Sequence, residues 1–314
     1  MSDSLPIASR PRFGAMAQAF DGAHARRIVR SISDWGYKAM WTGDHIAFTG
    51  PINDPLTQIA YFAALAPELV FGTCVYLLPL RNPVIVAKSV ATVDRLLGAA
   101  HFIFGVGGGG EFPPEYEASG VPLNERGGRM NEAIPLLRRL WTERRIAHEG
   151  KYFRFGEIPM EPKPATPGGP PIWIGGRADP VLKRTASSGD GWMPYVVTPE
   201  RYAKSLETIA AHAAREKRSI DHFGTGLLLF CTMGSSYEQA LDVAAAHLSK
   251  RYAMDFREPA KRYCALGKPA DVAARLSEFI KAGVRDFVID AISPAQERDA
   301  QMEQFARDVI PLLS

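Results

Sequence analysis

Eight short β-prone runs alternate with amphipathic helical stretches along the whole sequence. The β-prone runs cover residues 12–17, 37–42, 69–77, 100–107, 170–176, 190–196, 225–233 and 285–292. The helical stretches cover residues 21–35, 55–66, 83–97, 125–142, 178–187, 199–215, 236–250, 270–282 and 296–313. Several β-prone runs, such as residues 101–106 and 286–291, are apolar without alternation. That pattern is typical of strands buried on both faces of a parallel sheet.

Eight strand–helix units predict a single (β/α)8 TIM barrel over residues 1–314. A doubly wound sheet is the alternative, but it would be unusually wide and would need a Gly-rich turn after its first strand. Residues 12–22 lack that turn. The connection over residues 107–170, after the fourth strand, is long enough to predict an insertion or lid. A second irregular stretch, residues 254–269, is expected to form a mobile flap.

Composition and charge exclude several classes of protein. The balance of 37 Lys and Arg against 34 Asp and Glu gives a net charge of +3, too small for a nucleic-acid-binding field. No apolar stretch is long enough to cross a membrane, and the first residues lack the apolar core of a signal peptide. The three cysteines, Cys74, Cys231 and Cys264, form no CxxC pair. We therefore expect a cytoplasmic protein without disulfides, metal site, membrane contact or nucleic-acid partner.

Two of the predicted strands end in glycine, and barrel active sites are built at strand ends. Gly107, Gly108, Gly109 and Gly110 follow the fourth strand. Because glycine is entropically costly, such a run indicates close approach of the backbone to a flat or bulky group. Gly175 and Gly176 lead into a helix whose first N–H groups, with Arg177, favour an anion. A ring with a phosphate-bearing tail would satisfy both features; for Gly175–Gly176 alone, a tight turn is the alternative.

Three titratable residues stand at the same strand ends. Asp44 and His45 follow the second strand, and Glu111 follows the glycine run. A histidine in this place can exchange a proton with a bound ring or substrate, and Glu111 is a candidate acid or acceptor. A helix-capping aspartate beside a structural histidine, and a solvated loop carboxylate, are the alternatives for these positions.

Other barrel chemistries lack their residues. No predicted strand end presents a lysine for a Schiff base, and no HxH pair or carboxylate cluster suits a metal. There is no GxSxG elbow for an acyl transferase or hydrolase. A site rich in backbone and aromatic groups remains, in which a bound organic cofactor would supply the reactivity.

At these residues the sequence resembles the luciferase-like monooxygenase superfamily of flavin- and deazaflavin-dependent oxidoreductases. The matching stretches include residues 40–48, 71–96, 104–120 and 170–192, and they run in family order over nearly the whole chain. The resemblance implies a (β/α)8 barrel with an insertion after strand four and a homodimer. It also implies FMN or the deazaflavin coenzyme F420 stacked at the barrel mouth, acting on a small organic substrate.

The resemblance also assigns roles to individual residues. It implies a non-proline cis peptide between Cys74 and Val75 beneath the ring, and Asp44 and His45 beside the ring. It implies a phosphate loop at Gly175, Gly176 and Arg177, with Asp190, Gly191 and Trp192 closing the site. Contacts to the cofactor are further expected from Gly107, Gly108 and Gly109, and Glu111 matches an acidic residue after the glycine run.

The leading hypothesis is therefore a cofactor-dependent oxidoreductase with catalytic residues His45, Glu111 and Asp44. With FMN, it would take reduced flavin from a separate flavin reductase and activate dioxygen. With F420, it would transfer hydride directly, with His45 or Glu111 handling the proton. The alternatives are a barrel that binds flavin without turnover, and a cofactor-free TIM-barrel lyase.

Overall fold

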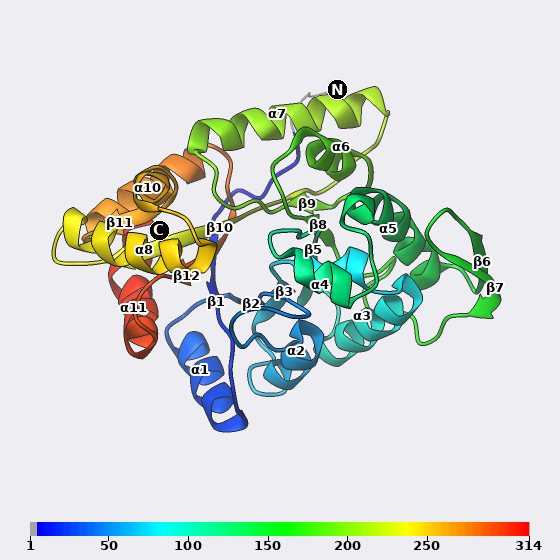
Figure 1. The fold of residues 1–314 in the computed structure, drawn as a ribbon, viewed down its shortest axis with the longest axis horizontal. Helices are drawn as coiled ribbons and strands as arrows, with labels where there is room; N and C mark the ends of the chain where they lie inside the picture. Colours follow the sequence, from blue (N-terminus) through cyan, green and yellow to red (C-terminus); the bar gives the residue numbers. More distant parts are fainter. Residues whose placement is uncertain (1–4, 314) are drawn as a thin grey trace.

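Eight parallel strands close into a barrel in the computed structural model, which describes residues 5–313 (Figure 1). In barrel order the strands are β1 (Arg12–Met16), β2 (Ala39–Thr42), β3 (Val70–Thr73) with its continuation β4 (Tyr76–Leu77), β5 (Phe102–Gly107), β8 (Ile172–Ile174), β9 (Gly191–Trp192), β10 (Gly224–Met233) and β12 (Asp286–Ala291). The barrel closes because β12 pairs in parallel with both β10 and β1. The predicted TIM-barrel fold is confirmed.

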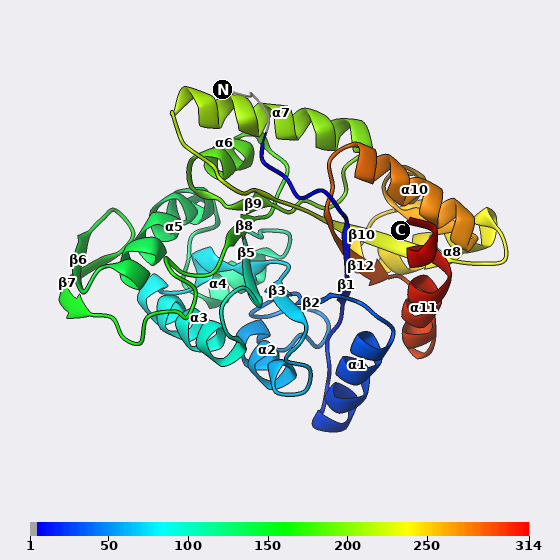
Figure 2. The same cartoon turned by 180° about the vertical axis from the view of Figure 1, so that it is seen from behind.

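The predicted helices surround the strands (Figure 2). They are α1 (Gly22–Asp34), α2 (Pro55–Ala63), α3 (Pro83–Leu97), α5 (Arg126–Thr142), α6 (Asp179–Ser188), α7 (Pro199–Arg215), α8 (Tyr237–Tyr252), α10 (Pro269–Lys281) and α11 (Arg298–Gln304), which continues as a π-helical and then a 3-10 segment to Leu313. Side-chain caps explain several starts. Asp21 accepts a hydrogen bond from the His24 N–H at 2.7 Å, and Thr198 accepts one from Arg201 at 3.3 Å.

The segment between β5 and β8 has two parts. Residues 107–125 leave β5 at the carboxyl end of the barrel and include the short helix α4 (Pro113–Ala118). After α5 comes an antiparallel hairpin, β6 (Arg145–Glu149) and β7 (Arg154–Pro159), at the edge of the molecule beyond α5 (Figure 1). Glu132 of α5 accepts hydrogen bonds from the N–H groups of Tyr152 and Phe153 in the hairpin turn, at 3.0 and 2.9 Å. The lid role of the insertion over residues 107–170 stays a prediction.

A second insertion stands between β10 and α10. It consists of α8, α9 (Arg257–Tyr263) and β11 (Ala265–Gly267), which pairs in parallel with the end of β10. Phe256, Ala260 and Leu266 are buried against α8. Most of the segment at residues 254–269 is therefore regular, because these apolar side chains pack it against α8 and β10. A mobile flap stays a prediction.

Two tryptophans fill the barrel lumen. The rings of Trp41 and Trp173 lie 5.7 Å apart between their centroids. Glycines on neighbouring strands make room for them, since a Cβ at Gly72 would lie 2.3 Å from Trp41 and one at Gly224 would lie 2.1 Å from Trp173. Towards the carboxyl ends of the strands the lumen opens, because Cys74, Val75 and Leu228 are only half-buried there. We call this open end the mouth.

Candidate active site

The two glycine-rich strand exits lie side by side on the rim of the mouth. Strands β5 and β8 pair in parallel, and the Gly175 N–H donates to the Val106 carbonyl at 2.8 Å. A Cβ at Gly107 would lie 2.4 Å from one Val75 methyl group, and a Cβ at Gly175 would lie 2.6 Å from the other. The Val75 side chain is therefore held between the two exits, and main chain without side chains flanks it on both sides.

The peptide bond between Cys74 and Val75 is cis, as the resemblance implies. The Cys74 thiol belongs to the lumen, and burial, with a smaller effect of Asp290, raises its pKa well above its usual range. It therefore stays a neutral thiol in an apolar setting. At the rim, Gly109 adopts a φ of +54°, and a Cβ there would lie 2.8 Å from Leu77. Both conformation and space thus require glycine at Gly109.

The predicted phosphate loop follows β8. The main-chain N–H groups of residues 176–179 donate to no acceptor in the described part of the chain, and they precede the first turn of α6. The exposed Arg177 adds a positive charge. From below, the buried Trp192 indole donates to the Gly176 carbonyl at 2.8 Å and fixes the loop. These free donors fit the phosphate group of a cofactor tail.

His45 is oriented by a carboxylate that the sequence did not reveal. Its Nδ1 lies 3.2 and 3.1 Å from the two oxygens of Glu115, whose side chain is fully buried. Glu115 stands on α4 and also accepts a hydrogen bond from the Ile46 N–H at 3.2 Å. The His45 ring stacks on Phe48 with 4.0 Å between centroids. Because Glu115 occupies Nδ1, the Nε2 atom remains for proton exchange.

Glu111 faces a second group of polar residues. The Tyr195 hydroxyl donates to its carboxylate. The Arg177 guanidinium lies over the Tyr195 ring at 5.2 Å and donates to the Tyr195 carbonyl at 3.4 Å. Burial raises the pKa of the Glu111 carboxyl, whereas the charges of Arg177 and His45 lower it. Glu111 and His45 thus influence each other across the mouth, and Tyr195 is a further residue that the sequence did not reveal.

Asp44 is part of a buried ion pair. Its oxygens accept hydrogen bonds from Arg81 at 2.5 and 2.9 Å, and the Leu77 N–H donates to it at 2.8 Å. The Asp44 side chain has no exposed surface, and Arg81 is 17% exposed. The catalytic and cofactor-binding roles of Asp44 stay predictions. The occupied oxygens favour a positioning role, because they fix the backbone of β4 beside Val75.

Asp190, Gly191 and Trp192, which were expected to close the site, lie in different parts of the barrel. Asp190 stands at the amino end of β9, where its carboxylate accepts from the Ile172 N–H at 2.8 Å and pairs with Arg138 and Arg218. This end of the strand is opposite the mouth, so a cofactor contact does not fit Asp190 there. Gly191 lies against Trp173 in the lumen, where a Cβ would be 2.6 Å from the indole. Trp192 contacts the loop after β8 through the Gly176 carbonyl. The cofactor-binding roles of these residues stay predictions.

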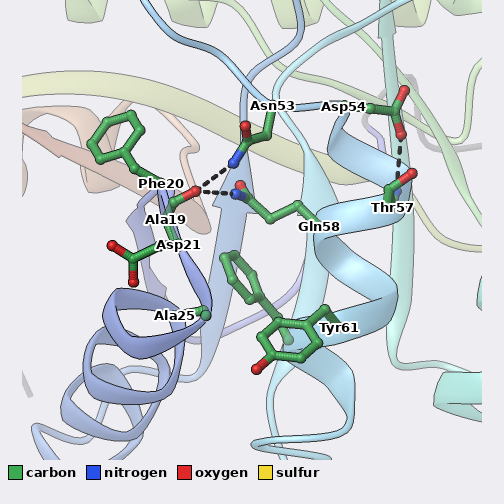
Figure 3. Close-up of a pocket in the computed structure, with 11 residues that line it drawn as sticks. Ala19, Phe20, Asp21, Ala25, Asn53, Asp54, Thr57, Gln58 and Tyr61 are labelled. Carbon is green, nitrogen blue, oxygen red and sulfur yellow. Dashed lines mark hydrogen bonds between the residues drawn. The ribbon is translucent and has the colours of Figure 1, made fainter.

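A separate cavity of about 310 Å3 lies outside the barrel, between the start of α1 and α2 (Figure 3). There Asn53 and Gln58 both donate to the Ala19 carbonyl. None of the predicted site residues lines this cavity. Within residues 5–313, no group of three or more His, Cys, Asp or Glu side chains is placed to hold a metal ion. No helix in that range is long and apolar enough to span a bilayer.

One family model and several known proteins match this chain in sequence. The model of the luciferase-like monooxygenase family matches residues 4–306. An F420-dependent glucose-6-phosphate dehydrogenase from Kineococcus radiotolerans is 26% identical, over 96% of each chain. A 4-hydroxyprotoasukamycin monooxygenase from Streptomyces nodosus subsp. asukaensis is 27% identical, over 68% of this chain and 60% of the relative.

A solved structure supports the same fold. An F420-dependent secondary alcohol dehydrogenase, solved with an F420-acetone adduct, superposes with a TM-score of 0.83 at 18% identity, over 97% of this chain and 99% of the other. The family match covers nearly the whole chain, and family members work with FMN or F420 on small organic substrates. The chain therefore belongs to the luciferase-like monooxygenase family and is a flavin- or deazaflavin-dependent oxidoreductase.

Proposed function

We propose that the protein is an F420-dependent oxidoreductase that transfers hydride to or from a small organic substrate. The observation that carries this proposal is that two titratable side chains, His45 and Glu111, are held by named partners at one glycine-lined mouth. His45 is oriented by Glu115, and Glu111 is held by Tyr195. Hydride transfer between a carbinol and a carbonyl also moves a proton, which a positioned acid or base must give or take.

The residues of the mouth fit such a cofactor. Val75 and the bare backbone of Gly107 would support the ring. The free N–H groups of residues 176–179, together with Arg177, would bind the phosphate of the tail. When bound, the cofactor would supply the hydride donor or acceptor that no side chain can provide.

His45 and Glu111 then divide the proton chemistry. The buried Glu115 carboxylate fixes the His45 ring and leaves Nε2 to take or give the proton of the substrate oxygen. Glu111 keeps its own proton to a higher pH than an ordinary carboxyl, because burial raises its pKa. In its protonated form, Glu111 could donate a hydrogen bond to the reacting group.

FMN-dependent monooxygenation is the second candidate. It is favoured by the monooxygenase relative, which matches 68% of this chain. In that case a separate flavin reductase would supply reduced FMN, and dioxygen would be the oxidant. For both candidates we infer a cytoplasmic homodimer, in line with the family resemblance and with the three free cysteines in the described residues.

Cofactor titration tests both candidates. We expect purified protein to quench the fluorescence of F420 on binding and to catalyse its reduction by an alcohol. His45→Gln and Glu115→Gln should each lower kcat by about 10²–10⁴-fold. His24→Gln, on α1, is the matched control and should leave kcat unchanged. A response to FMN alone would favour the monooxygenase, and no response to either cofactor would reject the proposed function.

A further inference from the structure

A buried carboxylate shared by two arginines lies at the carboxyl end of β12. Asp290 accepts a hydrogen bond from Arg251 at 2.9 Å through one oxygen and from Arg298 at 2.6 Å through the other. Asp290 is 4% exposed, whereas the side chains of Arg251 and Arg298 are 38% and 36% exposed. The three residues come from β12, the end of α8 and the start of α11.

The charges of this group do not balance. One guanidinium is enough to neutralise Asp290, and among the described residues neither arginine lies within ion-pair distance of another carboxylate. Each guanidinium has five N–H donors. Arg251 uses one of them on Asp290 and also interacts with the Tyr252 side chain, and Arg298 uses Nη2 on Asp290 and on the Met16 carbonyl. One positive charge and several donors therefore remain for a partner outside the chain.

This group borders the mouth. Val288, two residues before Asp290 on β12, belongs to the lumen, and side chains two apart on a strand point to the same side. Met16, whose carbonyl Arg298 contacts, also belongs to the lumen. Burial raises the pKa of Tyr252, Arg251 lowers it, and Glu111 and Asp290 raise it further. Tyr252, next to Arg251, is thus within electrostatic reach of Glu111 as well as of Asp290.

Aromatic side chains surround the arginines. The Arg251 guanidinium lies 5.6 Å from the centre of the Phe230 ring, and Tyr195 meets Phe230 edge-on with 6.3 Å between centroids. Tyr252, next to Arg251 in the sequence, stacks on Phe256 at 5.1 Å. A ligand that reaches the arginines would therefore place its body against rings.

We propose that Arg251 and Arg298 bind an oxyanion group of the substrate, a carboxylate or a phosphate, while its apolar or unsaturated body lies against Phe230 and Tyr195. This inference rests on the proposed function and adds a substrate class to it. The planar guanidinium fork suits both kinds of oxyanion. Asp290 acts as a positioning residue, because its hydrogen bonds hold the guanidinium groups of Arg251 and Arg298 at a fixed separation.

Calorimetric titration of small probes tests the subsite. Benzoate and phenyl phosphate are the anionic probes, and benzamide is the neutral probe closest in shape to benzoate. We expect both anions to bind at least about tenfold more tightly than benzamide, with and without F420 present. The preferred anion distinguishes a carboxylate from a phosphate substrate. Arg251→Gln and Arg298→Gln should each weaken anion binding by about tenfold and leave benzamide unaffected.

Two further sets of variants serve as controls for this test. Arg257→Gln, an exposed arginine of the same insertion that pairs with Asp242 and Glu238, is the matched control. Arg251→Lys and Arg298→Lys keep the charge next to Asp290, and we expect them to fold and to bind the anions with intermediate affinity. Equal binding of anions and benzamide, no binding of any probe at millimolar concentration, or anion binding unaltered in the arginine variants would overturn the subsite. Titrations of the same samples with F420 and FMN test the proposed function independently of the subsite.

Discussion

The Asp44–Arg81 ion pair provides a quantitative test of how the mouth is built. Arg81→Met removes two of the three hydrogen bonds that Asp44 accepts and leaves a carboxylate with no exposed surface. Breaking a buried ion pair by removing one partner costs about 3–5 kcal/mol. Because Arg81 is 17% exposed, water can reach part of the vacated site, and we expect a loss near the lower end, about 3 kcal/mol.

Urea unfolding followed by circular dichroism measures this loss. The matched control is Arg145→Met, which breaks an ion pair with Glu157 whose partners are both more than half exposed, and should cost less than about 1 kcal/mol. The double variant Asp44→Asn/Arg81→Met should be more stable than Arg81→Met, because no buried unpaired charge remains and the other partner of Arg81, Asp54, is about half exposed. A loss for Arg81→Met no larger than that of the control, or a double variant less stable than the single one, would refute this reasoning.

Three other predictions follow from single contacts. Gly107→Ala places a Cβ 2.4 Å from a branched side chain and should lower the free energy of unfolding by about 1–3 kcal/mol and weaken F420 binding, whereas Gly156→Ala, with open space around it, should do neither. Tyr195→Phe removes a donor to the ionised Glu111 carboxylate, so its pKa should rise further and the alkaline fall of kcat/KM should shift to higher pH; a shift to lower pH would contradict the assignment. Burial alone would raise the pKa of Glu132, but the hydrogen bonds from His148 and the hairpin N–H groups lower it below 4.5, so its contribution to stability is present at neutral pH and disappears as the pH falls through the lowered value. The stability difference between wild type and Glu132→Gln in urea should therefore shrink on acidification, and a constant difference would count against the linkage.

Most of the barrel could be predicted from the sequence because its strands are buried on both faces. Strand β12, apolar without alternation, is an example. The hairpin β6–β7 was not predicted, because no residue of β7 is buried and its two large apolar residues, Phe155 and Ile158, give no clear strand pattern. The order of the 254–269 segment was missed for another reason. Its apolar residues pack on α8 and the end of β10, which lie close only in the folded chain.

The parts of the candidate site that lie directly at strand ends could be predicted from the sequence. The glycines of both exits and His45 lie at strand ends that any barrel brings to one face. Their partners were not predictable, since Glu115 lies 70 residues from His45, and Tyr195 lies 84 residues from Glu111. Asp190 was expected to close the site, but it precedes β9, and a residue before a barrel strand lies at the end opposite the mouth.

The paired tryptophans of the lumen limit which substitutions the barrel interior can accept during evolution. Trp41 and Trp173 and the glycines around them divide a fixed interior volume among six different strands. A smaller residue in place of either indole would leave an empty space, and a larger residue in place of any of these glycines would collide with a ring. Substitutions at these positions should therefore occur together, so that a smaller side chain on one strand is compensated by a larger one on another. The residues at the rim of the mouth are not under this constraint.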